Sequence, residues 1–184
     1  MKVSGNGQGK ILTADELSLL FESGFKSKRD KALFGICLYT ACRVSEACAL
    51  RTSDVDLKSM SLIFRKSTTK GKLKSRIIDI DSALFNLLAN YNPKSGYLFP
   101  GRVPAAPLTR FMADRILRIA CERVRLQGVS THSFRRTALT MMSSAGIPLR
   151  VIQEISGHGD LGTLQRYLEV SQEQKRLAIS AIRF

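Results

Sequence analysis

Histidine, tyrosine and an excess of basic side chains are the residue types in this sequence that could carry out chemistry on a phosphate. Phosphoryl transfer without a cofactor needs a nucleophile, cations around the non-bridging oxygens and an acid for the leaving oxygen. His132 lies three residues before Arg135, a spacing that places both side chains on one face of a helix. Alone, this pair is more typical of a solvated helix surface than of an active site.

A second candidate pair, His158 and Tyr167, lies near the C-terminal end of the chain. His158 stands between Gly157 and Gly159, so it could approach a ligand closely on a tight turn or simply follow the end of a helix. Tyr167 follows nine residues later, and its hydroxyl is a potential nucleophile. Taken alone, Tyr167 is more typical of a core tyrosine.

The balance of charge points to a polyanionic partner. The chain has 29 lysines and arginines against 15 acidic residues, a net charge of +14. Such a field attracts nucleic acid from a distance and holds it by displacing condensed counterions. On charge alone, a basic protein that is merely soluble remains an alternative. With 44% hydrophobic and 24% charged residues, the composition is that of a globular protein and argues against general disorder.

Four cysteines are present, without a C-x-x-C pair, and three of them fall in an apolar helical stretch. Buried, reduced thiols are favoured over disulfides or a zinc site, which indicates an intracellular protein. Two histidines and dispersed acidic residues offer no ligand cluster, so neither a metal nor another cofactor is expected. No apolar segment has the length of a membrane span, so we expect a cytoplasmic protein that does not enter a membrane.

Hydrophobic periodicity and capping signals predict a mainly α fold with a small antiparallel β-sheet (α+β) in one domain. Thr13-Ala-Asp-Glu16 has the pattern of a capping box. Two strands, 60–65 and 76–80, flank a polar hairpin tip, and the proline-rich segment 92–107 is a surface connection. The predicted helices cover residues 13–21, 28–42, 45–50, 81–91, 109–126, 132–145, 148–156, 162–169 and 172–182.

The order of these groups along the chain carries a family resemblance. The motifs are Thr40-Ala-Cys-Arg43-Val-Ser-Glu46-Ala, Thr69-Lys70-Gly71-Lys72, Thr131-His132-Ser-Phe-Arg135-Arg-Thr137, Ile155-Ser-Gly157-His158 and Gln165-Arg-Tyr167. In this order and with these spacings they resemble the signature of the tyrosine recombinases, which include phage integrases and Xer-type and Cre-type enzymes. Two positions depart from the family pattern: Ser156 stands where leucine is common, and Arg136 where histidine is frequent.

The resemblance implies a tyrosine recombinase catalytic-domain fold over residues 11–184. Residues 1–10 are then a flexible tail or linker remnant, and the family's N-terminal DNA-clamping domain is expected to be absent from this chain. The implied function is that of a site-specific recombinase or integrase. Tyr167 would cleave DNA through a 3′-phosphotyrosyl intermediate, and the retained bond energy would allow religation without ATP or a metal.

The resemblance also assigns roles to the other motif residues. Arg43 and Arg135 would bind the non-bridging oxygens, because a guanidinium matches phosphate geometry and stays protonated. Lys70 would protonate the leaving oxygen, although other lysines of the same tip could substitute. His132 would accept or orient the tyrosine proton, and His158 would bind the phosphate. The remaining candidates are Glu46, which would orient Arg43, and the possible DNA contacts Lys66, Lys72, Lys74, Arg76 and Arg136.

The implied partner is double-stranded DNA, bound by a homo-oligomer such as a tetramer, with a monomer as the alternative in isolation. The expected compartment is the cytoplasm, in association with the nucleoid. The last helix, 172–182, would pack on its own domain or be donated to a neighbouring protomer. Two other functions remain open at this point: a type IB topoisomerase-like relaxing enzyme and a non-catalytic DNA-binding relative.

Overall fold

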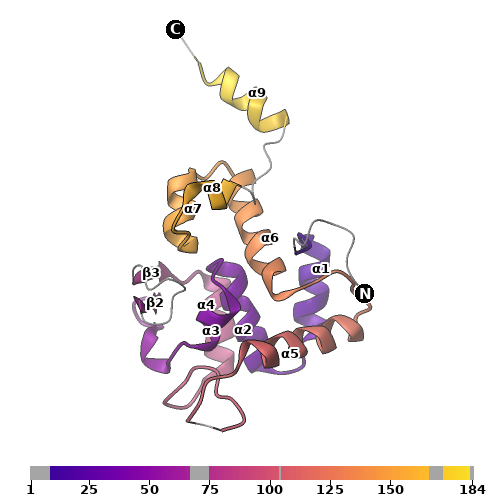
Figure 1. Cartoon of the computed structure of the whole chain (residues 1–184), viewed down its shortest axis with the longest axis vertical. Helices are drawn as coiled ribbons and strands as arrows, with labels where there is room; N and C mark the ends of the chain where they lie inside the picture. Colours follow the sequence, from indigo (N-terminus) through magenta and orange to yellow (C-terminus); the bar gives the residue numbers. More distant parts are fainter. Residues whose placement is uncertain (1–8, 67–74, 104, 166–171, 183–184) are drawn as a thin grey trace.

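The computed structural model describes residues 9–66, 75–103, 105–165 and 172–182. Helices from distant parts of the sequence pack around a shared core, with a small sheet at one side (Figure 1). The elements in chain order are α1 (Ala14–Leu19), η1 (Leu20–Gly24), α2 (Lys28–Tyr39), α3 (Val44–Cys48), η2 (Thr52–Asp54), β1 (Val55–Asp56), β2 (Ser61–Phe64), β3 (Arg76–Asp79), α4 (Ser82–Tyr91), α5 (Arg110–Arg123), α6 (Thr131–Ser144), α7 (Leu149–Ser156), α8 (Leu161–Gln165) and α9 (Gln172–Ser180).

The predicted fold class, mainly α with a small antiparallel sheet, is confirmed. The described strands form one antiparallel sheet in the order β1-β2-β3. Leu62 of β2 pairs with Ile78 of β3, and both side chains are buried. Two residues farther along β2, Phe64 lies opposite Arg76. Because directly paired residues of an antiparallel sheet project from the same face, the register brings Arg76 over a buried aromatic ring.

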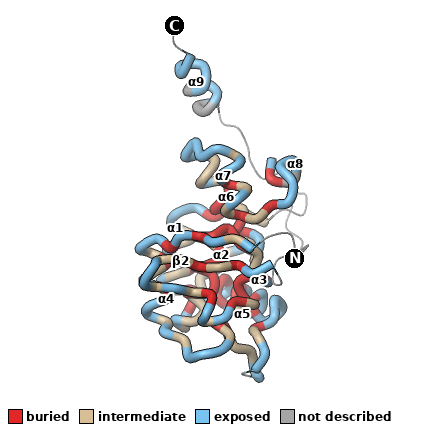
Figure 2. Tube along the Cα trace, turned by 90° about the vertical axis from the view of Figure 1, so that its left-hand side faces the viewer, coloured by how far each residue is buried: buried red, intermediate tan, exposed pale blue. Residues whose placement is uncertain are grey.

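A cluster of phenylalanines lies at the centre of the core. The rings of Phe25 and Phe34 stack with centroids 4.8 Å apart, and Phe134 lies 5.0 Å from Phe34. All three side chains are fully buried, and each contributes about 2–3 kcal/mol through burial of apolar surface. Phe134 belongs to α6, so its burial against α2 sets which side of α6 faces inward (Figure 2).

The predicted helix starts lie within a residue of those in the structure, and local side-chain caps at Thr13, Ser27, Asp81 and Thr109 account for several of them. Thr13 Oγ1 accepts a hydrogen bond from the Glu16 amide, and the Glu16 carboxylate accepts one from the Thr13 amide. Asp81 caps α4 through the Leu84 amide in the same way. These caps satisfy backbone donors that the first turn of a helix cannot pair.

The predicted helix ends agree less well. The helix predicted over 28–42 ends at Tyr39, because Ala41 adopts a left-handed backbone with φ of 48°. The first helix ends at Leu19 and continues as the π-helix η1 to Gly24, and α5 ends at Arg123 instead of residue 126. These ends depend on tertiary contacts, which leave a weaker local signal than a side-chain cap.

All four cysteines are free and buried, as predicted. Burial raises the pKa of the Cys48 thiol to about 12 and that of Cys121 to about 11. Both thiols are therefore protonated at neutral pH and unsuited to nucleophilic attack. In the part of the chain that the structure describes, no helix combines the length and the apolar character needed to cross a membrane.

The two ends of the described chain differ in how they pack. At the N-terminal end, the Gly9 carbonyl accepts a hydrogen bond from Arg136, and Lys10 forms an ion pair with Glu16. Residues 9 and 10, which the sequence assigned to the tail, therefore contact the helices. At the other end, α9 projects away from the other helices (Figure 1). Ile179 on this helix and Ile182, two residues beyond its end, are exposed.

Candidate active site

Arg43 is positioned by the sharp turn between α2 and α3. Its backbone amide donates a 2.8 Å hydrogen bond to Glu46 Oε2, which closes the first turn of α3. The guanidinium Nη1 lies 3.9 Å from the same oxygen, beyond hydrogen-bond distance. The Arg43 side chain is 26% exposed, whereas Glu46 is 1% exposed. Arg43 can therefore reach a ligand from outside while the carboxylate stays buried.

Arg135 is held by backbone carbonyls from two other parts of the chain. Its Nη1 donates to the carbonyl of Ala41 at 2.6 Å and to that of Ser156 at 2.9 Å. The left-handed backbone at Ala41 is uncommon for a residue with a side chain and costs roughly 1–2 kcal/mol. Ser156 is the last residue of α7, where carbonyls have no partner within the helix. Both carbonyls thus serve to hold a buried guanidinium.

His158 lies directly after the end of α7 and contacts Arg135. Gly157 ends the helix with φ of 68°, and the imidazole of His158 is buried. Arg135 Nη2 lies 2.9 Å from Nε2 and 3.1 Å from Nδ1, and Ser156 Oγ lies 2.7 Å from Nδ1. The serine that departs from the family pattern therefore contacts the histidine of the same motif.

Burial lowers the pKa of both His158 and Arg135, but only the imidazole loses its charge at neutral pH. Burial, together with the positive charges of Arg135 and Arg43, lowers the pKa of His158 to about 3. Burial and the charge of Arg43 also lower the pKa of Arg135, to about 10. At neutral pH the imidazole is therefore neutral and the guanidinium remains charged.

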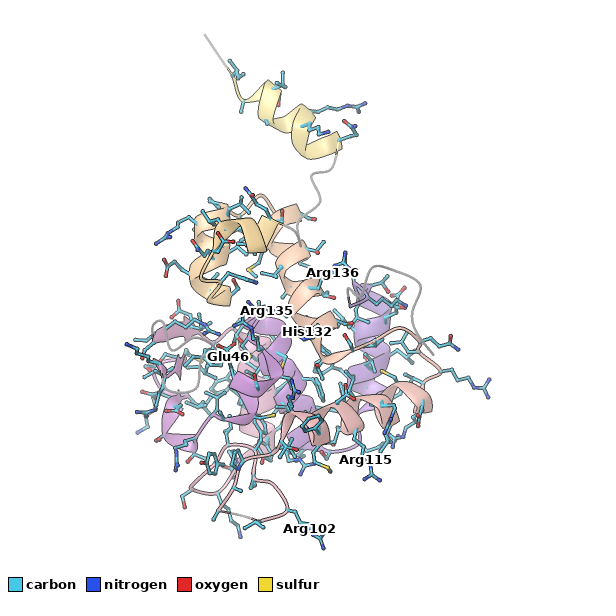
Figure 3. All side chains as sticks on the ribbon, in the orientation of Figure 1. Glu46, Arg102, Arg115, His132, Arg135 and Arg136 are labelled. Atoms are coloured by element: carbon cyan, nitrogen blue, oxygen red, sulfur yellow. The ribbon has the colours of Figure 1, made fainter. Side chains whose placement is uncertain are left out.

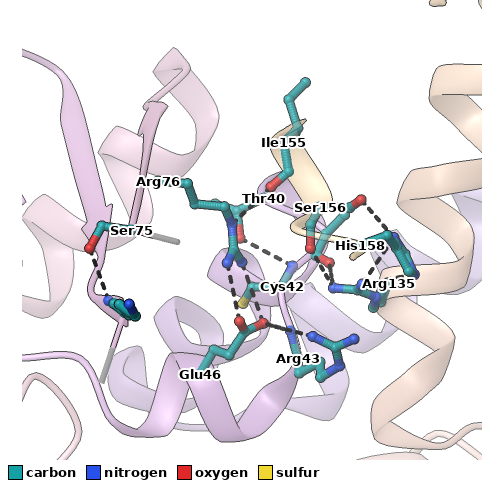
Figure 4. A network of polar contacts seen from close by, with 12 residues as sticks. Thr40, Cys42, Arg43, Glu46, Ser75, Arg76, Arg135, Ile155, Ser156 and His158 are labelled. Carbon is teal, nitrogen blue, oxygen red and sulfur yellow. Dashed lines mark hydrogen bonds and ion pairs between the residues drawn. The ribbon is translucent and has the colours of Figure 1, made fainter. Parts of the chain in front are cut away.

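Arg76 of β3 lies beside this site and contacts α3, α7 and β2 (Figure 4). Its Nη1 and Nη2 lie 3.1 and 3.3 Å from the two carboxylate oxygens of Glu46, a bidentate pair. Its Nε donates to the Ile155 carbonyl at 3.0 Å, and its guanidinium carbon lies 4.2 Å from the centre of the Phe64 ring. The side chain is 9% exposed.

Arg43, Arg76 and Arg135, here called the arginine cluster, carry more positive charge than their ion pairs neutralise. Among the described residues, those ion pairs all lead to the one carboxylate of Glu46. A partly buried surplus of guanidinium groups is suited to an anion, and a phosphodiester offers the oxygen geometry that arginine binds best.

The structure brings together some of the predicted catalytic residues. Arg43, Glu46, Arg135 and His158 meet at the N-terminal ends of α3 and α6 and the C-terminal end of α7 (Figure 4). His132 lies on the first turn of α6, one turn before Arg135, and its side chain is exposed (Figure 3). The other predicted catalytic residues, Lys70 and Tyr167, lie outside the described residues, as do the DNA-contact candidates Lys72 and Lys74.

The three described DNA-contact candidates lie in different surroundings. Lys66 is exposed just beyond β2. Arg136 is half-buried, and its Nη1 donates to the Gly9 carbonyl at 2.8 Å. The sequence pattern placed Arg76 on an exposed hairpin facing DNA, but its guanidinium is buried by Glu46 and Phe64. No local signal in the sequence distinguishes this arginine from Arg65 or Lys66, which are exposed.

Comparison with known proteins decides the family. The model of the phage integrase family matches residues 10–174. The chain belongs to the phage integrase family. It is 33% identical to a tyrosine recombinase of Pseudothermotoga lettingae over 178 residues, which cover 94% of this chain and 60% of the relative. It is also 33% identical to the tyrosine recombinase XerA of Pyrococcus furiosus, with coverage of 92% and 60%.

Solved structures of integrase-family proteins share the fold. The crystal structure of XerA recombinase matches with a TM-score of 0.78 and 25% identity, covering 100% of this chain and 67% of that protein. The Tn1549 transposon integrase, solved in complex with transposon right end DNA, matches with a TM-score of 0.77 and 17% identity over 97% of this chain and 68% of that one. The present chain thus spans about 60% of the length of the curated relatives.

Proposed function

We propose that this integrase-family chain is the catalytic part of a site-specific recombinase that breaks and rejoins double-stranded DNA. The observation that carries the proposal is the convergence of Arg43, Arg135 and the neutral His158 on one site with a surplus of positive charge. We assign residues 11–184 to this catalytic domain. The naming of its relatives as tyrosine recombinases supports the assignment.

The chemistry follows from what each side chain can offer a phosphate. Charge builds up on the non-bridging oxygens as a nucleophile attacks phosphorus, and prearranged guanidinium donors stabilise it. Arg43, the more exposed, would bind the phosphate directly, and Arg135 would contribute through its Nη2 edge beside His158. A neutral imidazole has one N–H to donate, so a phosphate oxygen bound to His158 would replace Arg135 or Ser156 as the partner of one ring nitrogen.

The nucleophile and the acid in the proposed reaction are Tyr167 and Lys70. The Tyr167 oxygen would form a bond to phosphorus while the bond from phosphorus to the 5′-oxygen breaks. His132 would take or orient the tyrosine proton, and Lys70 would supply a proton to the leaving oxygen. One phosphodiester is exchanged for another, so the reverse attack by the 5′-hydroxyl rejoins the strand without ATP.

Recombination joins two DNA duplexes, so we propose that the active form is a homo-oligomer on DNA, such as a tetramer. The exposed side chains of Ile179 on α9 and Ile182 just beyond it are compatible with packing of this segment against a neighbouring protomer. Because its substrate is DNA, the enzyme would act in the cytoplasm, at the nucleoid.

A covalent-capture experiment tests the reaction and recovers the DNA site in one step. The protein would be incubated at low salt with a pool of nicked duplexes of randomised sequence, from which the short cleaved strand can diffuse away. We expect a protein–DNA adduct that survives detergent and contains phosphotyrosine. Sequencing of the captured DNA would then identify the site.

The matched control is Tyr167→Phe, which removes a single oxygen. We expect this variant to bind the recovered DNA normally and to form no adduct. Absence of an adduct with the unaltered protein, or an adduct that persists in Tyr167→Phe, would contradict the proposal. Relaxation of a supercoiled plasmid that lacks the recovered site would favour a topoisomerase instead.

A further inference from the structure

We infer that Arg76 is a positioning residue, which holds the Glu46 carboxylate and thereby leaves the Arg43 guanidinium available to the phosphate. The inference rests on the proposed function and extends it to a residue whose guanidinium is paired with Glu46 and 9% exposed. Two arginines, Arg43 and Arg76, lie near the buried Glu46 carboxylate and compete for it.

The distances show which arginine holds the carboxylate. Arg76 meets Glu46 through two contacts of 3.1 and 3.3 Å, whereas the Arg43 guanidinium stays 3.9 Å away. Two parallel contacts from a guanidinium fork are the strongest pairing available to a carboxylate. Glu46 is therefore neutralised by Arg76, and only the backbone amide of Arg43 is bonded to it.

The exposure of the side chains supports the same division of roles. Arg76 is 9% exposed and Arg43 26% exposed, so the residue that can reach a ligand is the one whose charge is less neutralised. Glu46 is 1% exposed, and an unpaired carboxylate at such a position is strongly unfavourable. If Arg76 were removed, Glu46 would draw the Arg43 guanidinium into a close ion pair and away from the phosphate.

Arg76 is also fixed in place from two further directions. Its Nε donates to the Ile155 carbonyl, while the next carbonyl along the chain, that of Ser156, holds Arg135. The end of α7 therefore holds the two buried arginines on neighbouring carbonyls. On the other side, the guanidinium lies over the Phe64 ring at 4.2 Å, a cation–π contact set by the sheet register.

The test uses two substitutions and two forms of the scissile phosphate in the DNA recovered by covalent capture. Arg76→Met removes the guanidinium, and Arg76→Lys keeps one charge without the bidentate fork. The second DNA carries a methylphosphonate, in which a methyl group replaces a non-bridging oxygen and removes the negative charge that arginines neutralise. Arg29→Met is the matched control, because it removes a guanidinium from an ion pair with Asp30 on α2.

If Arg76 acts through Arg43, both Arg76 variants will cleave ordinary DNA about tenfold to a hundredfold more slowly than the unaltered protein, the scale known for groups that orient a ligand-binding residue. On methylphosphonate DNA the ratio of rates will fall to within about threefold, because the missing charge no longer needs Arg43. Arg29→Met should cleave both DNAs at the unaltered rate. Adding Glu46→Gln to Arg76→Met should restore part of the lost rate, because the competing charge is gone.

The remaining outcomes would contradict either the role of Arg76 or the proposed function. An equal defect on both DNAs would show that Arg76 acts on DNA affinity or general folding and would overturn the inference. Unaltered cleavage by both variants, or thermal unfolding that leaves neither folded, would overturn it as well. Failure of the unaltered protein to form an adduct would instead remove the proposed function, so the two failures can be told apart.

Discussion

At the residue scale, burial and the charges of Arg135 and Arg43 act together on the imidazole of His158 and lower its pKa from 6.5 to about 3. In the unfolded chain the same imidazole has its ordinary pKa of about 6.5. Between these two values the unfolded state binds a proton that the folded state does not. His158 therefore makes the stability of the protein dependent on pH.

The sign of this dependence follows from proton linkage. The depressed pKa costs no stability above pH 6.5, where both states are neutral, and reduces stability as the pH falls toward 3. From about pH 8 to about pH 5 we expect His158 to account for a loss of about 2 kcal/mol in the free energy of unfolding. Urea unfolding at both pH values, with His158→Gln as the non-titrating control, measures this loss as a difference between the two proteins. Parallel pH profiles would show that His158 is not held neutral.

At the element scale, the C-terminal end of α7 positions three residues of the site, namely Arg76, Arg135 and His158. The neighbouring carbonyls of Ile155 and Ser156 hold Arg76 and Arg135, and Gly157 then turns the chain toward His158. A Cβ atom at Gly157 would lie 2.7 Å from Arg76 Nη1. Glycine is therefore needed here for two reasons, the positive φ and the space for a guanidinium.

The end of α6 offers a matched comparison. Gly146 has φ of 76°, close to the 68° of Gly157, but nothing lies within 4 Å of a Cβ built there. Gly146→Ala should cost about 1 kcal/mol for the backbone alone, and Gly157→Ala about 2–3 kcal/mol because Arg76 must also move.

Thermal unfolding and the rate of DNA cleavage would be measured for Gly146→Ala and Gly157→Ala. We expect the cleavage rate to fall in Gly157→Ala and to stay unchanged in Gly146→Ala, since only the first displaces Arg76. Equal losses of stability, with equal cleavage, would show that the turn conformation matters and the contact with Arg76 does not.

At the scale of the whole molecule, under the proposed function the net charge of +14 would act on DNA through two separate contributions. Arg43 and Arg135 would bind one phosphate, whereas exposed basic side chains such as Lys66 would contact the backbone without regard to sequence. Binding by several phosphate contacts releases counterions, so affinity falls steeply as salt rises. The first contribution would control the reaction, and the second would control affinity.

We expect the affinity of the chain for duplex DNA to fall by about a thousandfold or more between about 50 and 200 mM salt, the range for roughly six to ten phosphate contacts. Lys66→Ala should weaken binding and reduce the salt dependence by about one phosphate contact. Arg102→Ala serves as the control, because Arg102 lies at the end of the molecule away from Arg135 (Figure 3). Fluorescence anisotropy with a labelled duplex measures both effects, and an equal change in the two variants would remove Lys66 from the DNA surface.

Parts of this fold that depend on local interactions were predictable. Thr13 and Asp81 signal helix starts because a side-chain oxygen pairs with a backbone amide three residues later. The segments 60–65 and 76–80, rich in Ile, Leu and Phe, predict two strands, and the structure has β2 and β3 there. In the site, the motif order identified Arg43, Arg135 and His158, and the structure brings these three together.

The sequence by itself determined the fold class, the helix starts, the buried thiols and the family motifs, because each is recorded in residue types at short spacing. Only the tertiary structure decided what Arg76 does and how Arg135 is held. Arg135 bonds to a carbonyl 94 residues away at Ala41, and Arg76 to one 79 residues away at Ile155. Such contacts use backbone oxygens, which every residue possesses, so they cannot be predicted from residue type. Packing alone brings those oxygens to the guanidinium groups.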